Sequence, residues 1–453
     1  VTKQTKISRG RFPMNSLNDM ALNFNNRIKF NFNGGDLTSD SGLLLLREFD
    51  EKLGFSSLIK NSFKTTDTAK HRFHCDADNL IQKVYMSIAS YFADSASDEL
   101  RMDPLFNHIL AKKLASQPTL SRFFSRMDKN TIKQLDEINM NMRKRIYSVE
   151  KPKHILLDVD STNFKTFGKQ EESSFNFHYK SNGYHPLLAF DGLTGDLLKA
   201  ELRPGSIYTS NGIEQFIRPL IKEFSELEPD THLSLRGDSG FAKPKLYELL
   251  EENSVSYAIR LKANASLYSL AAGAVQELTD ICTSNILDYK VVYDEFYYQA
   301  NSWDVPRRVV VKVEKPSNQM VFMHSFIVTN MELSPMQVLM FYCNRGKMEN
   351  YIKEFKNGFR FDRMSSNSFL TNQNKLQMYV ITYNLFNWFR RLVLSKEFRK
   401  LQIDTIRIKM FKVAAKVVRG GGYIKFKLCS YFQYKKEFMQ TLDNIYALNP
   451  KLE

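Results

Sequence analysis

The chain has 453 residues, 43% of them hydrophobic and 13% aromatic, which is typical of a folded protein of two or three domains and excludes a globally disordered chain. Its 64 Lys and Arg against 49 Asp and Glu give a formal net charge of +15, which favours a polyanionic partner. Four widely spaced cysteines and the lack of a long apolar run argue against a disulfide framework and a membrane span, so we expect a protein of a reducing cytosol.

The first third of the chain is predicted to be helical after a polar start. Residues 1–36 are basic and Asn-rich, and we expect a flexible arm there. Residues 37–150 show helical periodicity, strongest over 42–49, 79–93 and 130–147. This segment is therefore predicted to be a helical N-terminal domain, and we assign DNA binding to it because the rest of the chain is occupied by other elements.

From residue 151 onward, short apolar strands alternate with helices, which predicts an α/β core. Strands are expected over residues 154–160, 184–191, 197–203, 233–237 and 255–261, and helices over 212–227 and 244–252. A purely β pattern follows, with strands expected over 289–299, 307–314 and 320–329. We therefore expect a β-rich insertion at residues 263–330 between two parts of the core, 151–262 and 331–400.

The last third begins with one helix and ends in a basic region. Ser334 suits an N-cap and Pro335 the first helical position, so a single helix is predicted from there to Asn357-Gly358. A second helix is expected over 372–393. Residues 389–427 hold twelve Lys or Arg against two acids, and within the predicted basic C-terminal region (401–453) Lys412 and Lys416 are candidate phosphate contacts.

The helix after Pro335 carries one acid between cations. At about 100° per residue, Tyr342, Arg345, Glu349 and Lys356 would fall within an arc of roughly 60°, forming a ridge about 21 Å long. A carboxylate that helps to bind Mg²⁺, flanked by phosphate-binding cations, suits phosphoryl transfer. A solvated helix face is the alternative interpretation.

Three further acids strengthen the first interpretation. Asp158 and Asp160 lie two residues apart on a predicted core strand, so their carboxylates share one face and repel each other unless a cation intervenes. Asp238 follows another short apolar strand, at the strand end where α/β folds bind ligands. Acids of this kind in a basic chain predict a site for two divalent cations, which would activate a nucleophile and stabilise a leaving oxygen.

Several motifs together resemble one protein family. The spacing Tyr342-x2-Arg345-x3-Glu349-x6-Lys356 is similar to the Tyr-Arg-Glu-Lys signature of insertion-sequence transposases of the IS-four superfamily. Six further segments resemble motifs of the IS-thirteen-eighty branch of that superfamily: Leu37-Thr-Ser-Asp-Ser-Gly-Leu-Leu-Leu-Leu46, Leu114-Ala-Ser-Gln-Pro-Thr-Leu-Ser121, Leu157-Asp-Val-Asp-Ser-Thr162, Leu202-Arg-Pro-Gly205, Arg236-Gly-Asp-Ser-Gly-Phe241 and Asp362-Arg-Met-Ser365. The resemblance extends from about residue 30 to residue 430.

This resemblance implies a ribonuclease-H-like catalytic core interrupted by the β insertion, and a DDE transposase that cleaves DNA and transfers strands. The metal-binding and catalytic acids would be Asp160, Asp238 and Glu349, with Asp158 as the alternative to Asp160. The expected cofactor is Mg²⁺, as two ions, and Mn²⁺ would substitute. Tyr342, Arg345 and Lys356 would contact the DNA.

Some relatives hold a flipped base on an aromatic residue of the insertion, a position that would correspond to Trp303, although a Trp packed in a β core is the competing interpretation. The implied partners are double-stranded DNA, as terminal inverted repeats and as target, and a second copy of the chain in a homodimer on DNA; no membrane is expected. Two alternatives stay open: a ribonuclease-H-like nuclease without strand transfer, and a transposase-derived regulatory protein that only binds DNA.

Overall fold

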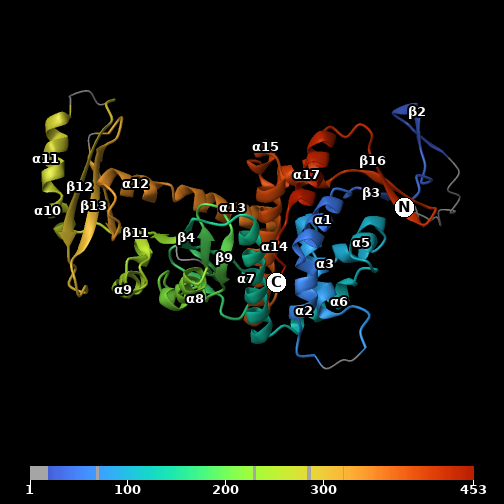
Figure 1. Cartoon of the computed structure of the whole chain (residues 1–453), viewed down its shortest axis with the longest axis horizontal. Coiled ribbons are helices and arrows are strands. Elements are labelled where there is room, and N and C mark those ends of the chain that lie inside the picture. The colour runs from blue at the N-terminus through green and yellow to red at the C-terminus, as the bar shows by residue number, and fades with distance from the viewer. Residues whose placement is uncertain (1–18, 68–70, 228–230, 283–286, 320, 453) are drawn as a thin grey trace, which may run out of the picture.

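The computed structural model describes residues 19–67, 71–227, 231–282, 287–319 and 321–452. Figure 1 shows an elongated molecule in which the N-terminal helices occupy one end and the β-rich edge of a large sheet the other, with the remaining strands of that sheet between them. Buried apolar side chains from Leu43 to Leu448 form one continuous cluster, so the helical end and the sheet share a core. Within the described residues, no helix is long and apolar enough to cross a membrane.

One mixed eight-stranded sheet organises the molecule. Its strands, in spatial order, are β12 (Lys290–Tyr298), β13 (Arg307–Lys315), β14 (Met323–Thr329), β11 (Ser256–Leu261), β10 (His232–Gly237), β4 (His154–Ser161), β8 (Leu187–Asp191) and β9 (Leu197–Glu201). Strands β4, β10 and β11 are mutually parallel, and every other neighbouring pair is antiparallel. The β-rich segment therefore extends the same sheet through the β11–β14 pairing. The fold is mixed α/β, as expected.

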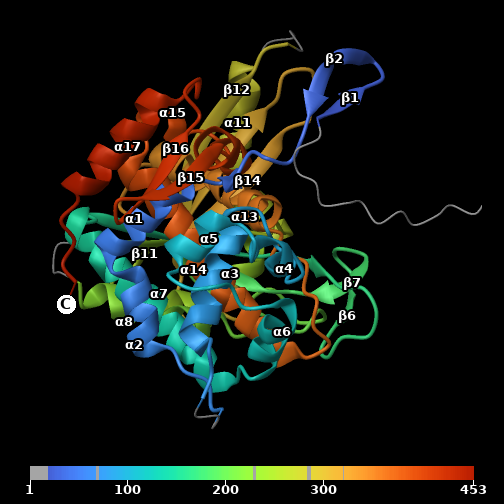
Figure 2. The same cartoon turned by 90° about the vertical axis from the view of Figure 1, so that its right-hand side faces the viewer.

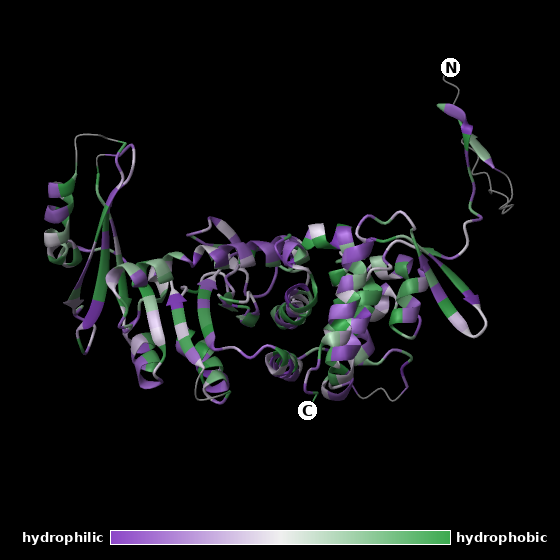
Figure 3. Ribbon diagram, turned by 45° about the horizontal axis from the view of Figure 1, so that its top comes forward, coloured by the Kyte–Doolittle hydropathy of each residue, from purple (hydrophilic) through white to green (hydrophobic). Residues whose placement is uncertain are grey.

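Helices pack against this sheet and also form the end of the molecule that lies away from β12 and β13. The helices before the sheet are α1 (Leu43–Leu53), α2 (Phe55–Ser62), α3 (Asp76–Ile88), α4 (Ala96–Leu100), α5 (Pro104–Ile109), α6 (Gln117–Ser125) and α7 (Lys129–Val149). Those between and after its strands are α8 (Ile213–Ser225), α9 (Pro244–Glu252), α10 (Ala265–Leu270), α11 (Ala272–Ile281), α12 (Pro335–Cys343), α13 (Gly346–Phe359), α14 (Phe369–Val393), α15 (Lys396–Arg399), α16 (Ile403–Ile406) and α17 (Lys435–Ala447). Figure 3 shows hydrophilic and hydrophobic bands alternating along many of them, as expected for helices with one buried face.

Three small sheets and two short helical turns complete the fold. They are β1 (Met20–Leu22) with β2 (Asn25–Phe30); β16 (Tyr423–Leu428), β15 (Ala415–Gly420) and β3 (Leu37–Thr38); β5 (Phe164–Lys165), β7 (Ser181–Tyr184) and β6 (Ser174–Asn176); and the turns η1 (Ser239–Phe241) and η2 (Arg407–Phe411). In Figure 2 the β1–β2 hairpin stands apart from the body of the molecule. Part of the segment expected to be a flexible arm is therefore a hairpin, and residues 1–18 of that segment lie outside the described residues.

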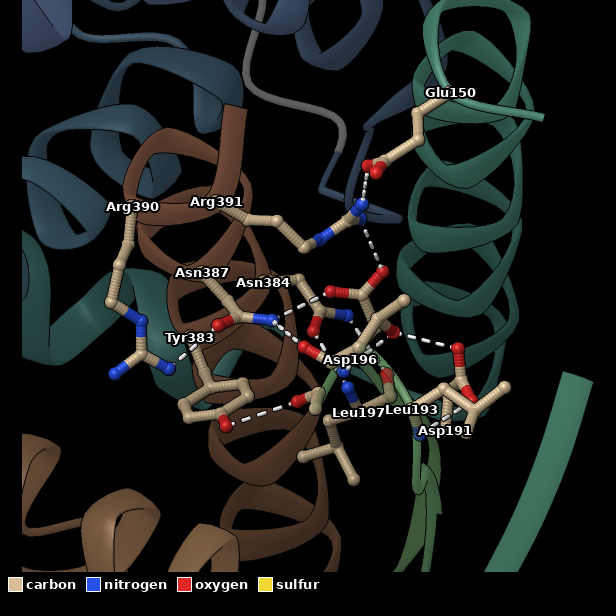
Figure 4. Close-up of polar contacts among 12 residues, drawn as sticks. Glu150, Asp191, Leu193, Asp196, Leu197, Tyr383, Asn384, Asn387, Arg390 and Arg391 are labelled. Atoms are coloured by element: carbon tan, nitrogen blue, oxygen red, sulfur yellow. Dashed lines mark hydrogen bonds and ion pairs between the residues drawn. The ribbon is translucent and has the colours of Figure 1, made fainter. Parts of the chain in front are cut away.

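Helix α14 joins the two ends through buried amides. The Asn384 side chain accepts a hydrogen bond from Leu197 N at 2.8 Å and donates one to Leu197 O at 2.8 Å, as a neighbouring strand would. Asn387 donates to the buried Asp196 carboxylate at 2.7 Å, and Arg391 lies 3.0 Å from the same group (Figure 4). These contacts satisfy the backbone of edge strand β9 and its turn, and so fix the sheet against the helices.

Most predicted elements are confirmed, with two differences near the site. The strand expected over 184–191 is divided into β7 and β8, because His185-Pro186 separates them and proline cannot donate a backbone hydrogen bond. The helix predicted from Pro335 to Asn357 is broken into α12 and α13 at Asn344-Arg345. Its start is as expected, since Ser334 is the N-cap and its backbone N–H donates to Gln337 at 3.1 Å.

Candidate active site

Asp160 lies near the end of the central strand β4. Its side chain is 18% exposed, and its carboxylate is 3.0 Å from a guanidinium nitrogen of Arg345. The pKa of Asp160 is raised to about 6: burial raises it most, Arg345 opposes the increase, and the charges of Asp238 and Glu349 add to it. The carboxylates of all three expected acids are therefore close enough to interact electrostatically.

Asp238 follows the neighbouring strand β10. Strand β10 runs parallel to β4, and Arg236 lies opposite Asp158. Asp238 and Asp160 each follow two residues later, so both lie at the same edge of the sheet. Asp238 caps the turn η1 by accepting a hydrogen bond from Gly240 N at 2.9 Å. Both acids line one cavity of about 630 Å³.

Other polar side chains also line this cavity. Tyr179 lines the same space, and its pKa is raised to about 12 by burial and by the charges of Asp160 and Asp238. His185 and the exposed Lys262 also line it. Sequence reasoning missed these three residues, since they come from separate loops and strand ends.

Glu349 is exposed on the first turn of α13 and is not among the residues lining that cavity. Across the residues that the structure describes, no three His, Cys, Asp or Glu side chains lie close enough together to hold a metal ion. The donor set nevertheless fits a hard divalent cation, because two carboxylates share one cavity and repel a third nearby. We infer that a cation would be held first by Asp160 and Asp238.

The break between α12 and α13 corrects the prediction of one continuous helix from Pro335 to Asn357. Around the break, Arg345 N bonds to Tyr342 O and Met348 N to Arg345 O, three residues back instead of four. Arg345 thereby turns toward strand β4, where it contacts Asp160 and lies 3.4 Å from Val159 O. Gly346, a poor helix former, begins the next helix. The four signature residues therefore lie on two helices and at the break between them.

Lys356 and Tyr342, the other two residues of the Tyr-Arg-Glu-Lys signature, lie against other parts of the protein. Lys356 donates to Thr162 Oγ1 at 2.5 Å and to Asn163 O at 2.9 Å, both directly after β4. Burial lowers the pKa of Lys356, against the opposing charges of Asp362 and Asp160. Tyr342 is half-buried, and burial raises its pKa. Lys356 thus supports the strand end that carries Asp160, whereas Tyr342 lies close to Arg345.

Asp158, the alternative acid, is occupied by an ion pair. It is fully buried and accepts two hydrogen bonds from Arg236, at 2.7 and 2.6 Å. Arg236 also donates to Phe341 O at 2.5 Å in the last turn of α12. Gly192 leaves room for this pair, because a Cβ there would lie 2.2 Å from Asp158 Oδ2. The structure therefore favours Asp160 over Asp158 at the site and adds Arg236 as a supporting residue.

Trp303 is only 7% exposed and packs in the core. Its ring lies 5.3 Å from that of Tyr247 and 5.4 Å from that of Tyr298, and the Arg307 guanidinium is 5.6 Å from its centroid. The base-stacking role of Trp303 stays a prediction. The competing interpretation, a Trp packed in a β core, accounts for these contacts.

The two candidate phosphate contacts near the C-terminus differ. Lys412 is 2.5 Å from the buried carboxylate of Asp40 and 3.1 Å from the hydroxyl of Tyr91. Lys412 therefore connects the C-terminal region to the start of the helical domain, and its role as a phosphate contact stays a prediction. Lys416 is exposed on β15.

Comparisons with known proteins identify the family of the chain. A sequence model of the family described as "Transposase DDE domain group 1" matches residues 20–450. Among solved structures, the piggyBac transposase in a synaptic complex with hairpin DNA is similar over 83% of this chain and 80% of its own, with 12% identity and a TM-score of 0.43. The Mos1 transposase in a paired-end complex with a left transposon end is similar over 49% of this chain and 72% of its own, with 13% identity and a TM-score of 0.18. No curated protein matches the chain.

Proposed function

The chain belongs to the transposase DDE domain family of group 1, and we propose that Asp160, Asp238 and Glu349 are the three acids of its active site. The protein is a DNA transposase, an enzyme of the DDE nuclease and strand-transfer class. One observation carries the residue assignment: Asp160 and Asp238 line one cavity, and the charges of Asp238 and Glu349 both act on the Asp160 carboxyl group.

Mg²⁺ is the proposed cofactor, as two ions, with Mn²⁺ as a substitute. Asp160 and Asp238 would hold it, and Glu349 would complete the set from the first turn of α13. When bound, the ions would activate a water or 3′-hydroxyl and stabilise the leaving oxygen. The arrangement of carboxylates around a partly buried cavity supports this proposal.

The surrounding cations suit the positioning of a DNA strand. Arg345 is held beside Asp160, and its planar guanidinium can bind a phosphate with two parallel hydrogen bonds. Lys356 orders the chain immediately after β4 through Thr162 and Asn163, and adds positive charge near the site. Tyr342 lies in the last turn of α12, just before the break between α12 and α13. These residues would orient the scissile phosphate toward the acids.

The proposed ribonuclease-H-like core is supported by the order and direction of the strands. Strands β9, β8 and β4 are antiparallel neighbours, and β10 and β11 then continue parallel to β4, an arrangement that supports a ribonuclease-H-like core. Residues 263–330, with β12 to β14, would be the insertion in that core. The IS-four and IS-thirteen-eighty assignment remains part of the proposal and rests on the sequence motifs.

We propose cut-and-paste transposition as the reaction sequence. The helical domain would recognise terminal inverted repeats, water would cleave the element's ends, and the freed 3′-hydroxyl would attack target DNA. Joining both ends to one target favours a homodimer on DNA.

A joining assay tests this function directly. The protein would be incubated with Mg²⁺, a plasmid and a pre-cleaved duplex that ends in the element's own repeat with a free 3′-hydroxyl. We expect covalent joining by the wild type and by a control, Asp443→Asn on α17, and none by Asp160→Asn or Asp238→Asn. A protein that cleaves an uncut repeat duplex but does not join the pre-cleaved one would instead be a nuclease, and repeat binding with neither activity would identify a regulatory protein.

A further inference from the structure

The hairpin of β15 and β16 separates its side chains onto two chemically different faces. Cross-strand partners on one face are Lys416 and Lys427, Val418 and Lys425, and Gly420 and Tyr423; those on the other are Ala415 and Leu428, Val417 and Phe426, and Arg419 and Ile424. We call Lys416, Lys425 and Lys427 the basic hairpin face. The second set is mostly apolar, as expected for a strand pair that covers a core on one side.

The apolar face anchors the hairpin to the helical end of the molecule. Ala415 and Val417 are buried, and the ring of Phe426 lies 6.1 Å from that of His108 on α5. Arg419 is 2.5 Å from Asp36, just before β3, which pairs with β15 as a third strand. The hairpin is therefore held in a defined orientation, with the basic hairpin face directed outward.

The basic hairpin face concentrates like charges. All three lysines are exposed, and none forms an ion pair with another described residue. Lys416 lies directly opposite Lys427 on the neighbouring strand. Two like charges directly opposite each other destabilise a strand pair, so this arrangement is unfavourable for the isolated chain. A polyanion placed over this face would offset the repulsion.

The tip of the hairpin allows close approach to a partner. Gly421 and Gly422 have φ of +60° and +78°, the conformation of a tight two-residue hairpin turn. A Cβ added at Gly420, Gly421 or Gly422 would meet no atom within 4 Å, so the backbone there is surrounded by open space. Tyr423, at the start of β16, is 71% exposed.

We infer that the basic hairpin face binds double-stranded DNA, with the glycine tip entering a groove. This inference rests on the proposed function, because that function is the reason to expect DNA as the polyanion. Two six-residue strands are about 20 Å long, and the major groove, about 12 Å wide, admits a two-stranded ribbon. In Figures 1 and 3 the hairpin lies at the helical end, away from β12 and β13, so the contact would be to DNA flanking the cleaved bond.

The test measures salt-dependent binding of the full chain to fluorescent duplexes, one with the terminal repeat and one of unrelated sequence. The variant is Lys416→Ala, Lys425→Ala and Lys427→Ala combined. Its control combines Lys133→Ala, Lys222→Ala and Lys245→Ala, three exposed lysines on helices α7, α8 and α9. The control removes the same charge, so a difference between the two reports position and not net charge.

We expect the hairpin variant to weaken binding to both duplexes by the same factor. The slope of log affinity against log salt should fall by up to about 2.7, because each lost phosphate contact contributes about 0.9. Its melting temperature should equal or exceed that of the wild type, since a repulsive pair is removed. Equal slopes for the hairpin variant and the control would overturn the inference, whereas wild type unable to bind any duplex would overturn the proposed function as well.

Discussion

Asp158 and Arg236 form a fully buried ion pair that joins the two strands carrying the candidate acids. Each lies two residues before an acid, Asp160 or Asp238, and the pair bonds through two oxygens at 2.7 and 2.6 Å. The third bond of Arg236, to Phe341 O, connects both strands to α12, shortly before the segment with Arg345 and Glu349. One guanidinium thus fixes three elements of the site.

Replacing Arg236 should therefore affect stability and catalysis together. Arg236→Gln leaves the Asp158 carboxylate buried without a counter-charge, so we expect a loss of about 3–5 kcal/mol in the free energy of unfolding. Urea unfolding measures this loss. The double variant Asp158→Asn/Arg236→Gln removes both charges and should recover part of the stability. If the single variant is as stable as wild type, the pair does not support the site.

The raised pKa of Asp160 predicts a pH-dependent stability difference. Because its folded pKa, about 6, exceeds its ordinary value of 3.8, its contribution is fully present below about pH 4 and is lost as pH rises through about 6. Asp160→Asn should therefore be more stable than wild type at pH 8 without divalent metal, by up to about 3 kcal/mol. Urea unfolding between pH 4 and 8 in EDTA checks this, and a difference that grows as pH falls would contradict it.

Trp303 should act through the core. Trp303→Ala removes a buried ring packed against Tyr247 and Tyr298, which we expect to lower the free energy of unfolding by about 3–5 kcal/mol. Thermal unfolding measures this change, and Trp303→Phe, which keeps an aromatic ring, should lose less. A stable Trp303→Ala enzyme that nicks normally but fails at the second strand would support the base-stacking role.

Lys412 should stabilise the fold without affecting the salt dependence of DNA binding. Lys412→Ala leaves the buried Asp40 carboxylate without its cation, so the melting temperature should fall. The salt slope of duplex binding should stay that of wild type, in contrast to the slope of the basic hairpin variant. A flatter slope with unchanged stability would support Lys412 as a phosphate contact.

The sequence predicted the parts of this site that depend on local pattern. Apolar runs identified β4 and β10, and the acids within or directly after them followed from strand alternation and strand ends. The helix start at Ser334 followed from its capping residues. These features depend on neighbours in the chain, so a periodic pattern suffices to find them.

Contacts between distant segments were not predictable in this way. The break at Arg345 accompanies an ion pair with Asp160, 185 residues earlier in the sequence, whereas the helical pattern continues across it. Arg236 and Asp158 lie 78 residues apart, and Lys412 and Asp40 lie 372 apart. No periodicity encodes such pairs, so a basic residue that anchors the fold and one that is free to bind DNA look the same in the sequence.

Cleavage of a labelled duplex carrying the element's own terminal repeat tests the central claim most directly. Wild type, Glu349→Gln and the control Glu277→Gln, an exposed Glu on α11, would be compared with Mg²⁺ and with EDTA. We expect Mg²⁺-dependent cutting at the repeat boundary by wild type and control, and none by Glu349→Gln, although Glu349→Gln binds the duplex normally. Undiminished cutting by Glu349→Gln would contradict the assignment of the active site.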